Sequence, residues 1–242
     1  MSKIAIITAL DRELHPLVRN WKPSSFSYGN RSYRVYQRDN VIAFAGGIGK
    51  TSAILAAKAV VANYQPETLL SAGLAGALIH TLKVGNVITP NVIMDAACGS
   101  EYRCDSGGGV LVSAAEITGP GSKQELVEHF HALAVDMEAA GVAEVARAEQ
   151  IGFGCVKAIS DEADFVLPPL KCFVDAQGGF QTGRFVAWAS VRPAVWPATI
   201  ALARNSNRAV RALCDWLARN IQQSAFSTQP VARNQSEECG VR

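Results

Sequence analysis

Short apolar runs that alternate with helix-forming stretches limit most strongly what this chain can fold into. Residues 3–10, 68–72 and 153–159 have the mostly apolar pattern of strands that are buried on both faces of a sheet. Residues 50–64 and 138–150 are rich in alanine and have a helical composition. This alternation predicts an α/β fold, a three-layer αβα sandwich around a mixed, mostly parallel central sheet.

The sequence predicts several further elements between these stretches. Residues 33–38 and 41–45 should pair as a hairpin through Asp39-Asn40, and Pro90 should interrupt a strand at residues 86–94. We also expect a loop at 97–109, strands at 110–113 and 132–135, a helix at 123–131, and a helical region at 183–223 that is broken at Pro193 and Pro197. Residues 1–223 should form one domain, and residues 224–242 should form a mobile tail.

The composition indicates a folded protein without the charge of a nucleic-acid-binding protein. The 242 residues are 49% apolar and 18% charged, and the net charge is only +2. Residues 184–219 contain six arginines and one acid, Asp215, so this segment carries +5 and the remainder −3. The six cysteines form no CxxC pair, and the apolar N-terminal run is too short for a secretion signal or a membrane span. We therefore expect a cytoplasmic protein that does not bind nucleic acid.

Two other familiar signals are incomplete. The segment Gly46-Gly47-Ile48-Gly49-Lys50-Thr51 resembles part of a P-loop, but that motif needs a glycine five residues before Gly49, where Phe44 stands. We interpret these glycines as a tight strand-to-helix turn, and the N-terminus of the following helix could still face an anion. The four histidines lack metal-ligand spacing, so we expect no metal and no cofactor.

Two carboxylates follow predicted strands, and ligands of open α/β sheets bind at the carboxyl ends of strands. Glu138 follows the strand at residues 132–135, and Asp161 follows the strand at residues 153–159 directly after Ser160. Either carboxylate could instead cap a helix or interact with its dipole. The small residues from Ser71 to Gly76 would let a ligand approach the backbone closely, or would serve tight packing of a helix on the sheet.

Taken together, these segments resemble the superfamily of purine nucleoside phosphorylases and methylthioadenosine/S-adenosylhomocysteine nucleosidases. The resemblance covers about residues 1–165 and consists of segments in a fixed order: Glu13 after the first strand, the Gly49-Lys50 helix start, Ala72-Gly73-Leu74-Ala75-Gly76, Val135-Asp136-Met137-Glu138-Ala139 and Ala158-Ile159-Ser160-Asp161. The Met-Glu-Ala and Ile-Ser-Asp segments are its most specific part.

The resemblance implies an enzyme that cleaves the bond between a ribose and a purine base and releases adenine. Asp161 would act as general acid toward the departing base, an effect worth roughly 10²–10⁴-fold in rate. Glu138 would bind the ribose hydroxyls, and Met137 would line the sugar. The other substrate-binding residues would be Ser160, Gly73, Leu74 and Ile117.

The resemblance leaves open which molecule accepts the ribose. In the nucleosidases an early glutamate, which Glu13 matches, deprotonates water. In many phosphorylases an arginine in the segment that matches residues 71–74 helps to bind phosphate, and neither Ser71 nor Leu74 supplies such a group here. Arg12 could bind phosphate in a bidentate manner instead. Phosphorolysis and the hydrolysis of methylthioadenosine, S-adenosylhomocysteine or futalosine therefore both remain open.

The C-terminal third is similar to the hopanoid-associated phosphorylases, which are assigned to removing adenine from adenosylhopane. This similarity implies a phosphorylase of hopanoid synthesis that acts on an apolar, adenosylhopane-like substrate, with inorganic phosphate as co-substrate. It rests on Leu167-Pro168-Pro169-Leu170, Phe173-Val174-Asp175, Thr182-Gly183-Arg184-Phe185, Arg192-Pro193, Trp196-Pro197 and Leu202-Ala203-Arg204-Asn205-Ser206.

Residues 185–203 carry a single charge, Arg192, and arginines flank them on both sides. Two prolines exclude one straight spanning helix, and the pattern suits a membrane interface as well as a broken helix in a subunit contact. We expect a homo-oligomer with a small-molecule nucleoside substrate, and peripheral contact with the inner face of a membrane through residues 184–211. The alternative from a different class is a non-catalytic nucleoside-binding or membrane-docking module.

Overall fold

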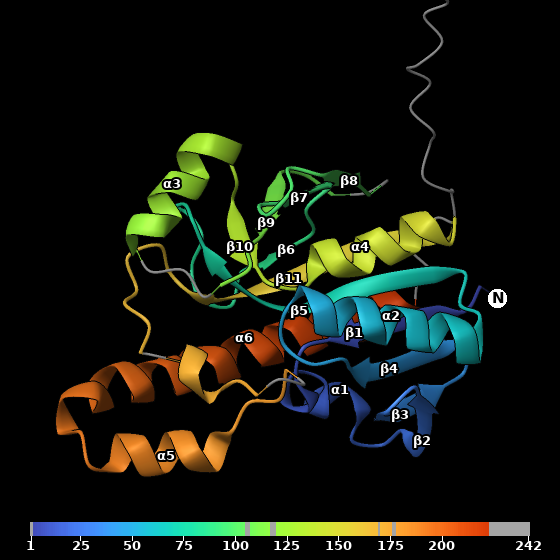
Figure 1. The fold of residues 1–242 in the computed structure, drawn as a ribbon, viewed down its shortest axis with the longest axis horizontal. Coiled ribbons are helices and arrows are strands. Elements are labelled where there is room, and N and C mark those ends of the chain that lie inside the picture. Colours follow the sequence, from blue (N-terminus) through green and yellow to red (C-terminus); the bar gives the residue numbers. More distant parts are fainter. Residues whose placement is uncertain (1, 105–106, 117–119, 169, 176–177, 223–242) are drawn as a thin grey trace, which may run out of the picture.

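The computed structural model describes residues 2–104, 107–116, 120–168, 170–175 and 178–222. Their strands form one mixed sheet in the order β2-β3-β4-β1-β5-β10-β9-β7-β8, from which β11 branches to pair with β5 and β6. Helices cover both faces of this sheet (Figure 1). The predicted α/β fold is confirmed, whereas the predicted tail lies outside the described residues.

The centre of the sheet consists of parallel pairs. Strand β1 (Ile4–Thr8) lies between β4 (Val41–Ala45) and β5 (Thr68–Ala77), and β11 (Gly152–Asp161) pairs with β5 along nearly its whole length. All five residues of β1 are buried because helices cover it on both sides. This double burial explains why the run is apolar without alternation.

Two helices pack on each face of this central region. Helices α2 (Lys50–Tyr64) and α4 (Ala139–Ala148) share one core with β1, β4 and β5, and their many buried alanines allow close approach to the strands. The short α1 (His15–Val18) and the long α6 (Trp196–Gln222) cover the opposite face. The two helical layers and the sheet form the predicted sandwich.

A smaller group of strands extends the sheet beyond β5. Strand β10 (Ala134–Asp136) pairs antiparallel with the end of β5 and parallel with β9 (Val110–Ser113), which also pairs with β7 (Val92–Asp95). Helix α3 (Pro120–Phe130) packs over β9 and β10 through Leu126, Val127 and Phe130. Val135 of β10 and Asp161 of β11 therefore both lie beside Gly76, close to the end of β5.

The hairpin of β3 (Arg31–Arg38) and β4 is confirmed, and so is the interruption at Pro90, which separates β6 (Val87–Ile88) from β7. Strand β2 (Lys22–Tyr28) was not predicted, because it is a largely exposed polar edge strand whose order comes from pairing with β3. The predicted loop at residues 97–109 is wrong where it contains β8 (Glu101–Arg103), which antiparallel pairing with β7 holds in place.

The C-terminal region breaks once rather than twice. Helix α5 (Thr182–Ser190) ends before the 3₁₀ turn η3 (Pro193–Val195), which leads into α6. Pro197 does not break α6, because it occupies the first turn of the helix. Backbone N–H groups in that turn have no hydrogen-bond partner within the helix, so a proline can replace one without loss. Within the described residues, no single helix is both long and apolar enough to cross a membrane, and α5 with residues 193–221 qualifies only as a pair bent by 118°.

Candidate active site

A cavity of about 190 Å³ lies at the carboxyl ends of the parallel strands β1, β5 and β11, where residues 135–138 of the antiparallel β10 and the chain after it also line it. Seven of the nine predicted site residues line it: Arg12, Glu13, Leu74, Met137, Glu138, Ser160 and Asp161. Gly73 lies behind Glu13 rather than on the cavity wall, and Ile117 lies outside the described residues. The structure therefore brings together the three predicted carboxylates from segments far apart in the sequence.

Two glycines of β5 make room for two of these carboxylates. A Cβ atom on Gly73 would lie 3.1 Å from Oε2 of Glu13, and a Cβ atom on Gly76 would lie 2.8 Å from Oδ2 of Asp161. Both distances are shorter than ordinary van der Waals contacts, so a larger residue would displace the carboxylate beside it. The small residues at the end of β5 thus serve the site as well as helix packing.

Glu13 reaches the cavity from the 3₁₀ turn η1 (Asp11–Glu13), which follows β1. Its side chain is buried, and its Oε2 accepts a hydrogen bond of 3.2 Å from the backbone N–H of Ala9. Burial raises the pKa of Glu13 to about 6, although the positive charges of Lys157 and Arg12 oppose the shift. A carboxylate with such a pKa can accept a proton near neutral pH.

Glu138 occupies the N-cap position of α4, but its side chain makes no capping bond to that helix. Its Oε1 instead accepts a hydrogen bond of 2.8 Å from the N–H of Gly49, the N-cap residue of α2. This helix N-terminus, which the sequence left open as a place for an anion, therefore faces the carboxylate of Glu138. Burial and the neighbouring charge of Asp136 raise the pKa of Glu138 to about 7.

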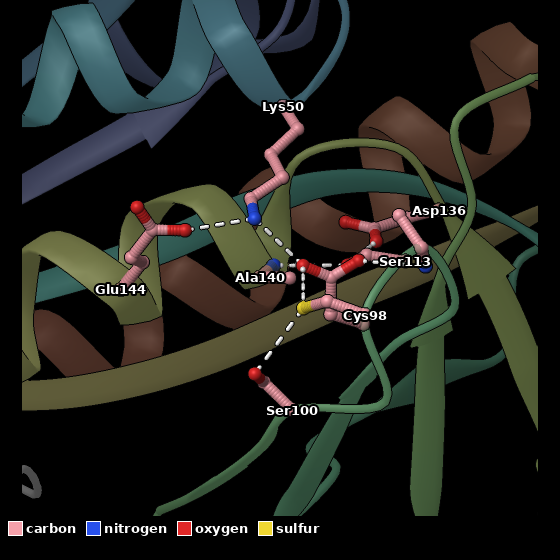
Figure 2. A network of polar contacts seen from close by, with 9 residues as sticks. Lys50, Cys98, Ser100, Ser113, Asp136, Ala140 and Glu144 are labelled. Carbon is pink, nitrogen blue, oxygen red and sulfur yellow. Dashed lines mark hydrogen bonds and ion pairs between the residues drawn. The ribbon is translucent and has the colours of Figure 1, made fainter.

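Asp136 fixes the segment that carries Glu138. Its Oδ1 accepts a hydrogen bond of 2.6 Å from the hydroxyl of Ser113, and its Oδ2 accepts one of 2.9 Å from the N–H of Ala139. The hydroxyl of Ser113 in turn accepts a hydrogen bond of 2.9 Å from the N–H of Ala140 (Figure 2). Asp136 and Ser113 therefore satisfy the first N–H groups of α4 and set the direction of the chain at Glu138.

Lys157 is a site residue that the sequence analysis missed. It lies within β11, is almost completely buried, and places Nζ 2.8 Å from Oδ2 of Asp136 and 3.1 Å from Oγ of Ser71. Burial alone would lower the pKa of Lys157, but the charges of Asp136 and Glu138 outweigh it and raise the pKa above the ordinary range. A lysine inside an otherwise apolar strand was the signal that could have identified it.

Lys50 has a structural role that differs from that of a P-loop lysine. Its Nζ lies 2.6 Å from Oδ2 of Asp95, at the end of β7. It also lies 2.7 Å from Oε2 of Glu144 on α4, a contact that Figure 2 shows. The ammonium group therefore joins α2, α4 and β7, as expected for a strand-to-helix turn that does not bind phosphate.

Asp161 ends β11 and points into the cavity. Its Oδ1 accepts a hydrogen bond of 2.9 Å from the hydroxyl of Ser160, and its Oδ2 lies 2.6 Å from Nζ of Lys123 on α3. In the part of the chain that the structure describes, no helix starts at Asp161, and the next helical turn is η2 (Lys171–Phe173). Helix capping therefore does not account for this carboxylate. Within the described residues, no group of three or more His, Cys, Asp or Glu side chains could hold a metal ion.

Part of this chain matches a known protein family, and its fold is similar to solved structures. Residues 3–116 match the model of the phosphorylase superfamily. The fold is similar to those of futalosine hydrolase from Helicobacter pylori strain 26695 (17% identity, 92% of this chain and 98% of that chain covered, TM-score 0.71) and of S-adenosylhomocysteine nucleosidase from Streptococcus pyogenes (19% identity, 92% and 97% covered, TM-score 0.68). A 5′-methylthioadenosine/S-adenosylhomocysteine nucleosidase from H. pylori is similar to the same degree, with 17% identity, 92% and 98% coverage and a TM-score of 0.71.

The match to the phosphorylase superfamily confirms the resemblance predicted from the sequence, and the solved structures confirm the predicted fold. The predicted class of enzyme, a nucleoside phosphorylase or N-glycosyl hydrolase, agrees with the superfamily model that residues 3–116 match, whereas the solved structures show the fold alone. The narrower similarity to hopanoid-associated phosphorylases remains a prediction.

Proposed function

We propose that this protein hydrolyses the N-glycosidic bond of a 5′-substituted adenosine and releases adenine. The observation that carries the proposal is the placement of Glu13, Glu138 and Asp161 around one cavity of about 190 Å³. Three carboxylates at the ends of β1, β10 and β11 supply a base, a ribose ligand and an acid within one site. The solved structures of nucleosidases and of futalosine hydrolase with this fold support a hydrolase of this class.

The reaction would proceed through a ribose with oxocarbenium character, while negative charge develops on the departing purine. Glu13, with a pKa raised to about 6, would orient water and accept its proton. Glu138 would bind the ribose hydroxyls, with its carboxylate held by the N–H of Gly49. Asp161 would deliver a proton to the five-membered ring of the base, with Ser160 fixing one of its oxygens.

Phosphorolysis is the second candidate reaction, and Arg12 is the residue that favours it. Arg12 is exposed at the cavity, where its guanidinium could bind two phosphate oxygens. Ser71 gives phosphate no support, because its hydroxyl is buried against Lys157 beneath the cavity. The buried base Glu13 therefore makes water the preferred acceptor in our proposal.

The cavity also supports an apolar 5′ substituent. Leu167, Leu170 and Leu202 line it from the C-terminal third of the chain. An adenosylhopane-like substrate would cover these side chains, whereas the methylthio group of methylthioadenosine would cover fewer of them. Burial of apolar area at about 25 cal/mol per Å² would then favour the bulkier substituent.

Adenine release from a panel of nucleosides, each measured with and without phosphate, tests the proposal. The panel should include methylthioadenosine, S-adenosylhomocysteine and an adenosine with a long alkyl 5′ group, together with futalosine, for which release of hypoxanthine is measured instead. We expect adenine release at equal rates with and without phosphate, and a loss of about 10²–10⁴-fold in Asp161→Asn. Strict dependence on phosphate would replace hydrolysis by phosphorolysis, and nucleoside binding without base release would favour the non-catalytic alternative.

A further inference from the structure

The ion pair between Lys123 and Asp161 has no counterpart among the roles assigned so far. Nζ of Lys123 lies 2.6 Å from Oδ2 of Asp161 and donates a second hydrogen bond of 3.0 Å to the carbonyl oxygen of Glu162. The side chains of Lys123 and Asp161 are 3% and 7% exposed, and both line the cavity. The proposed general acid therefore shares one of its oxygens with a buried ammonium group.

Packing of α3 alone does not explain this lysine. Leu126, Val127 and Phe130 already attach α3 to the sheet through an apolar contact. Lys123 lies near the N-terminal end of α3, where the helix dipole disfavours a positive charge. A buried ion pair also adds little net stability, since desolvation of the two charges offsets their attraction. An unfavourable placement of this kind is expected where a residue serves the chemistry of a site.

We propose that Lys123 is a positioning residue that orients Asp161 and resupplies the proton that Asp161 gives to the departing base. The inference rests on the proposed function. As the bond between C1′ and N9 breaks, its electron pair stays with the purine. One proton passes from Nζ of Lys123 to Oδ2 of Asp161, and the carboxyl group passes it to N7. The neutral amine regains a proton from solvent after adenine leaves.

The charges of the pair support this role. An ionised aspartate alone would repel the negative charge that develops on the purine, whereas an aspartate paired with an ammonium group presents no net charge. The hydroxyl of Ser160 occupies Oδ1 of Asp161, so Oδ2 is the oxygen through which Lys123 acts. Lys123 thus supplies a donor at the place where a proton is needed, from a side chain that is itself almost completely buried.

Replacement of Lys123 by arginine separates proton supply from a structural role. Arginine keeps the positive charge beside Asp161, but a guanidinium group does not lose its proton in proteins. We expect K123R to remain folded and to release adenine about 10²–10⁴-fold more slowly than the wild type. The second substrate is 4-nitrophenyl riboside, whose leaving group departs as the stable 4-nitrophenolate and needs no proton. Its cleavage by K123R should therefore stay within about tenfold of the wild-type rate if only proton transfer is lost.

The matched control is Lys83→Met, which removes a surface ion pair of 2.9 Å between Lys83 and Glu162 next to Asp161. This control should leave both reactions unchanged. Adenine release by K123R at the wild-type rate would overturn the proton-supply role, and so would equal losses on the two substrates. If instead the wild type releases adenine from no nucleoside, the proposed function fails and the inference fails with it. Lys123→Met should lose adenine release at least as strongly as K123R, and an active Lys123→Met enzyme would also refute the inference.

Discussion

Nζ of Lys157 lies 2.8 Å from Oδ2 of Asp136, and both side chains are sealed from solvent beneath the candidate active site. The charge of this single ammonium group also lowers the pKa values of Glu13 and Glu138, against the burial that raises them. One buried cation therefore holds together the carboxylates that come from η1, from β10 and from the start of α4. The site depends on this charge balance as much as on the shape of the sheet.

Loss of the buried ammonium group should be costly. In Lys157→Met, Asp136 remains buried without its partner, and removal of one member of a buried ion pair typically costs about 3–5 kcal/mol. We expect a loss of this size in the free energy of unfolding measured by urea titration. Lys83→Met serves as the control, because it removes an exposed ion pair that should contribute less than about 1 kcal/mol. A loss below about 1 kcal/mol in Lys157→Met would contradict the balance described above.

The pH dependence of turnover should follow the ionisation of Glu13. Burial raises its pKa to about 6, and a general base must lose its proton before it can accept one from water. We therefore expect kcat/KM to rise with pH through about 6 and then to level off. Glu13→Gln should lose this rise together with most of the activity. A profile in which kcat/KM falls across this range would exclude Glu13 as the base.

The free energy of unfolding should also depend on pH through Glu13, and it should fall as the pH rises whereas kcat/KM rises. The pKa of Glu13 is raised from 4.5 to about 6, so the folded protein binds this proton more tightly than the unfolded chain does. The contribution of Glu13 is therefore fully present below pH 4.5 and is lost as the pH rises to about 6, which amounts to about 2 kcal/mol. Glu13→Gln does not undergo this loss of stability, because a glutamine side chain does not ionise. We expect it to gain stability relative to the wild type between these pH values, as measured by unfolding at pH 4 and pH 7.

Two substitutions of Glu138 should distinguish its role in ribose binding from its role in stability. In Glu138→Gln the side-chain carbonyl can still accept the hydrogen bond from the N–H of Gly49, so α2 should keep its start while ribose binding weakens. Glu138→Ala removes the acceptor as well, which should cost about 1 kcal/mol more in stability, as for a lost helix cap. We expect both variants to have a raised KM and a lowered kcat, and only Glu138→Ala to melt earlier. Equal melting temperatures would show that the contact with Gly49 is unimportant for α2.

Much of the fold could be predicted because its strands and helices follow local rules. The start and end of α2 were predicted correctly, because its alanines favour a helix and the glycines at residues 46–49 indicate a turn directly before it. Glu138 and Asp161 could also be predicted, because Asp161 lies at a strand end and Glu138 shortly after one, whereas Glu13 was predicted only from the family resemblance. The chain order of such short segments was enough to indicate the site.

The cations of the site could not be predicted in the same way. Lys123 meets Asp161 only because α3 packs over β9 and β10, and nothing in the local sequence around Lys123 indicates that contact. Lys157 gave a signal, a charge within an apolar strand, but its partner Asp136 lies on a different strand. Pairings of this kind are fixed by tertiary structure, as is the exposed edge strand β2.

An exposed apolar surface lies on α5, η3 and the start of α6. Val186, Val191, Trp196 and Ile200 are 46–72% exposed there, with Arg192 among them. Figure 1 shows that α5 and the first half of α6 extend beyond the sheet. Trp188 does not belong to this surface, because it packs against Phe173 and Phe185. The predicted membrane contact would therefore use the four exposed residues rather than Trp188.

A double variant of Trp196 and Ile200 tests this prediction. Apolar side chains beside arginines favour a membrane surface that contains anionic lipid, where each arginine contributes about 1 kcal/mol. We expect the wild type to sediment with vesicles of mixed neutral and anionic lipid, and Trp196→Ser/Ile200→Ser to stay in solution. Val166→Ser is the control, since Val166 is 67% exposed outside these helices and should not affect binding. If the wild type does not bind vesicles but forms a dimer that the double variant cannot form, the surface is a subunit interface and the membrane prediction is wrong.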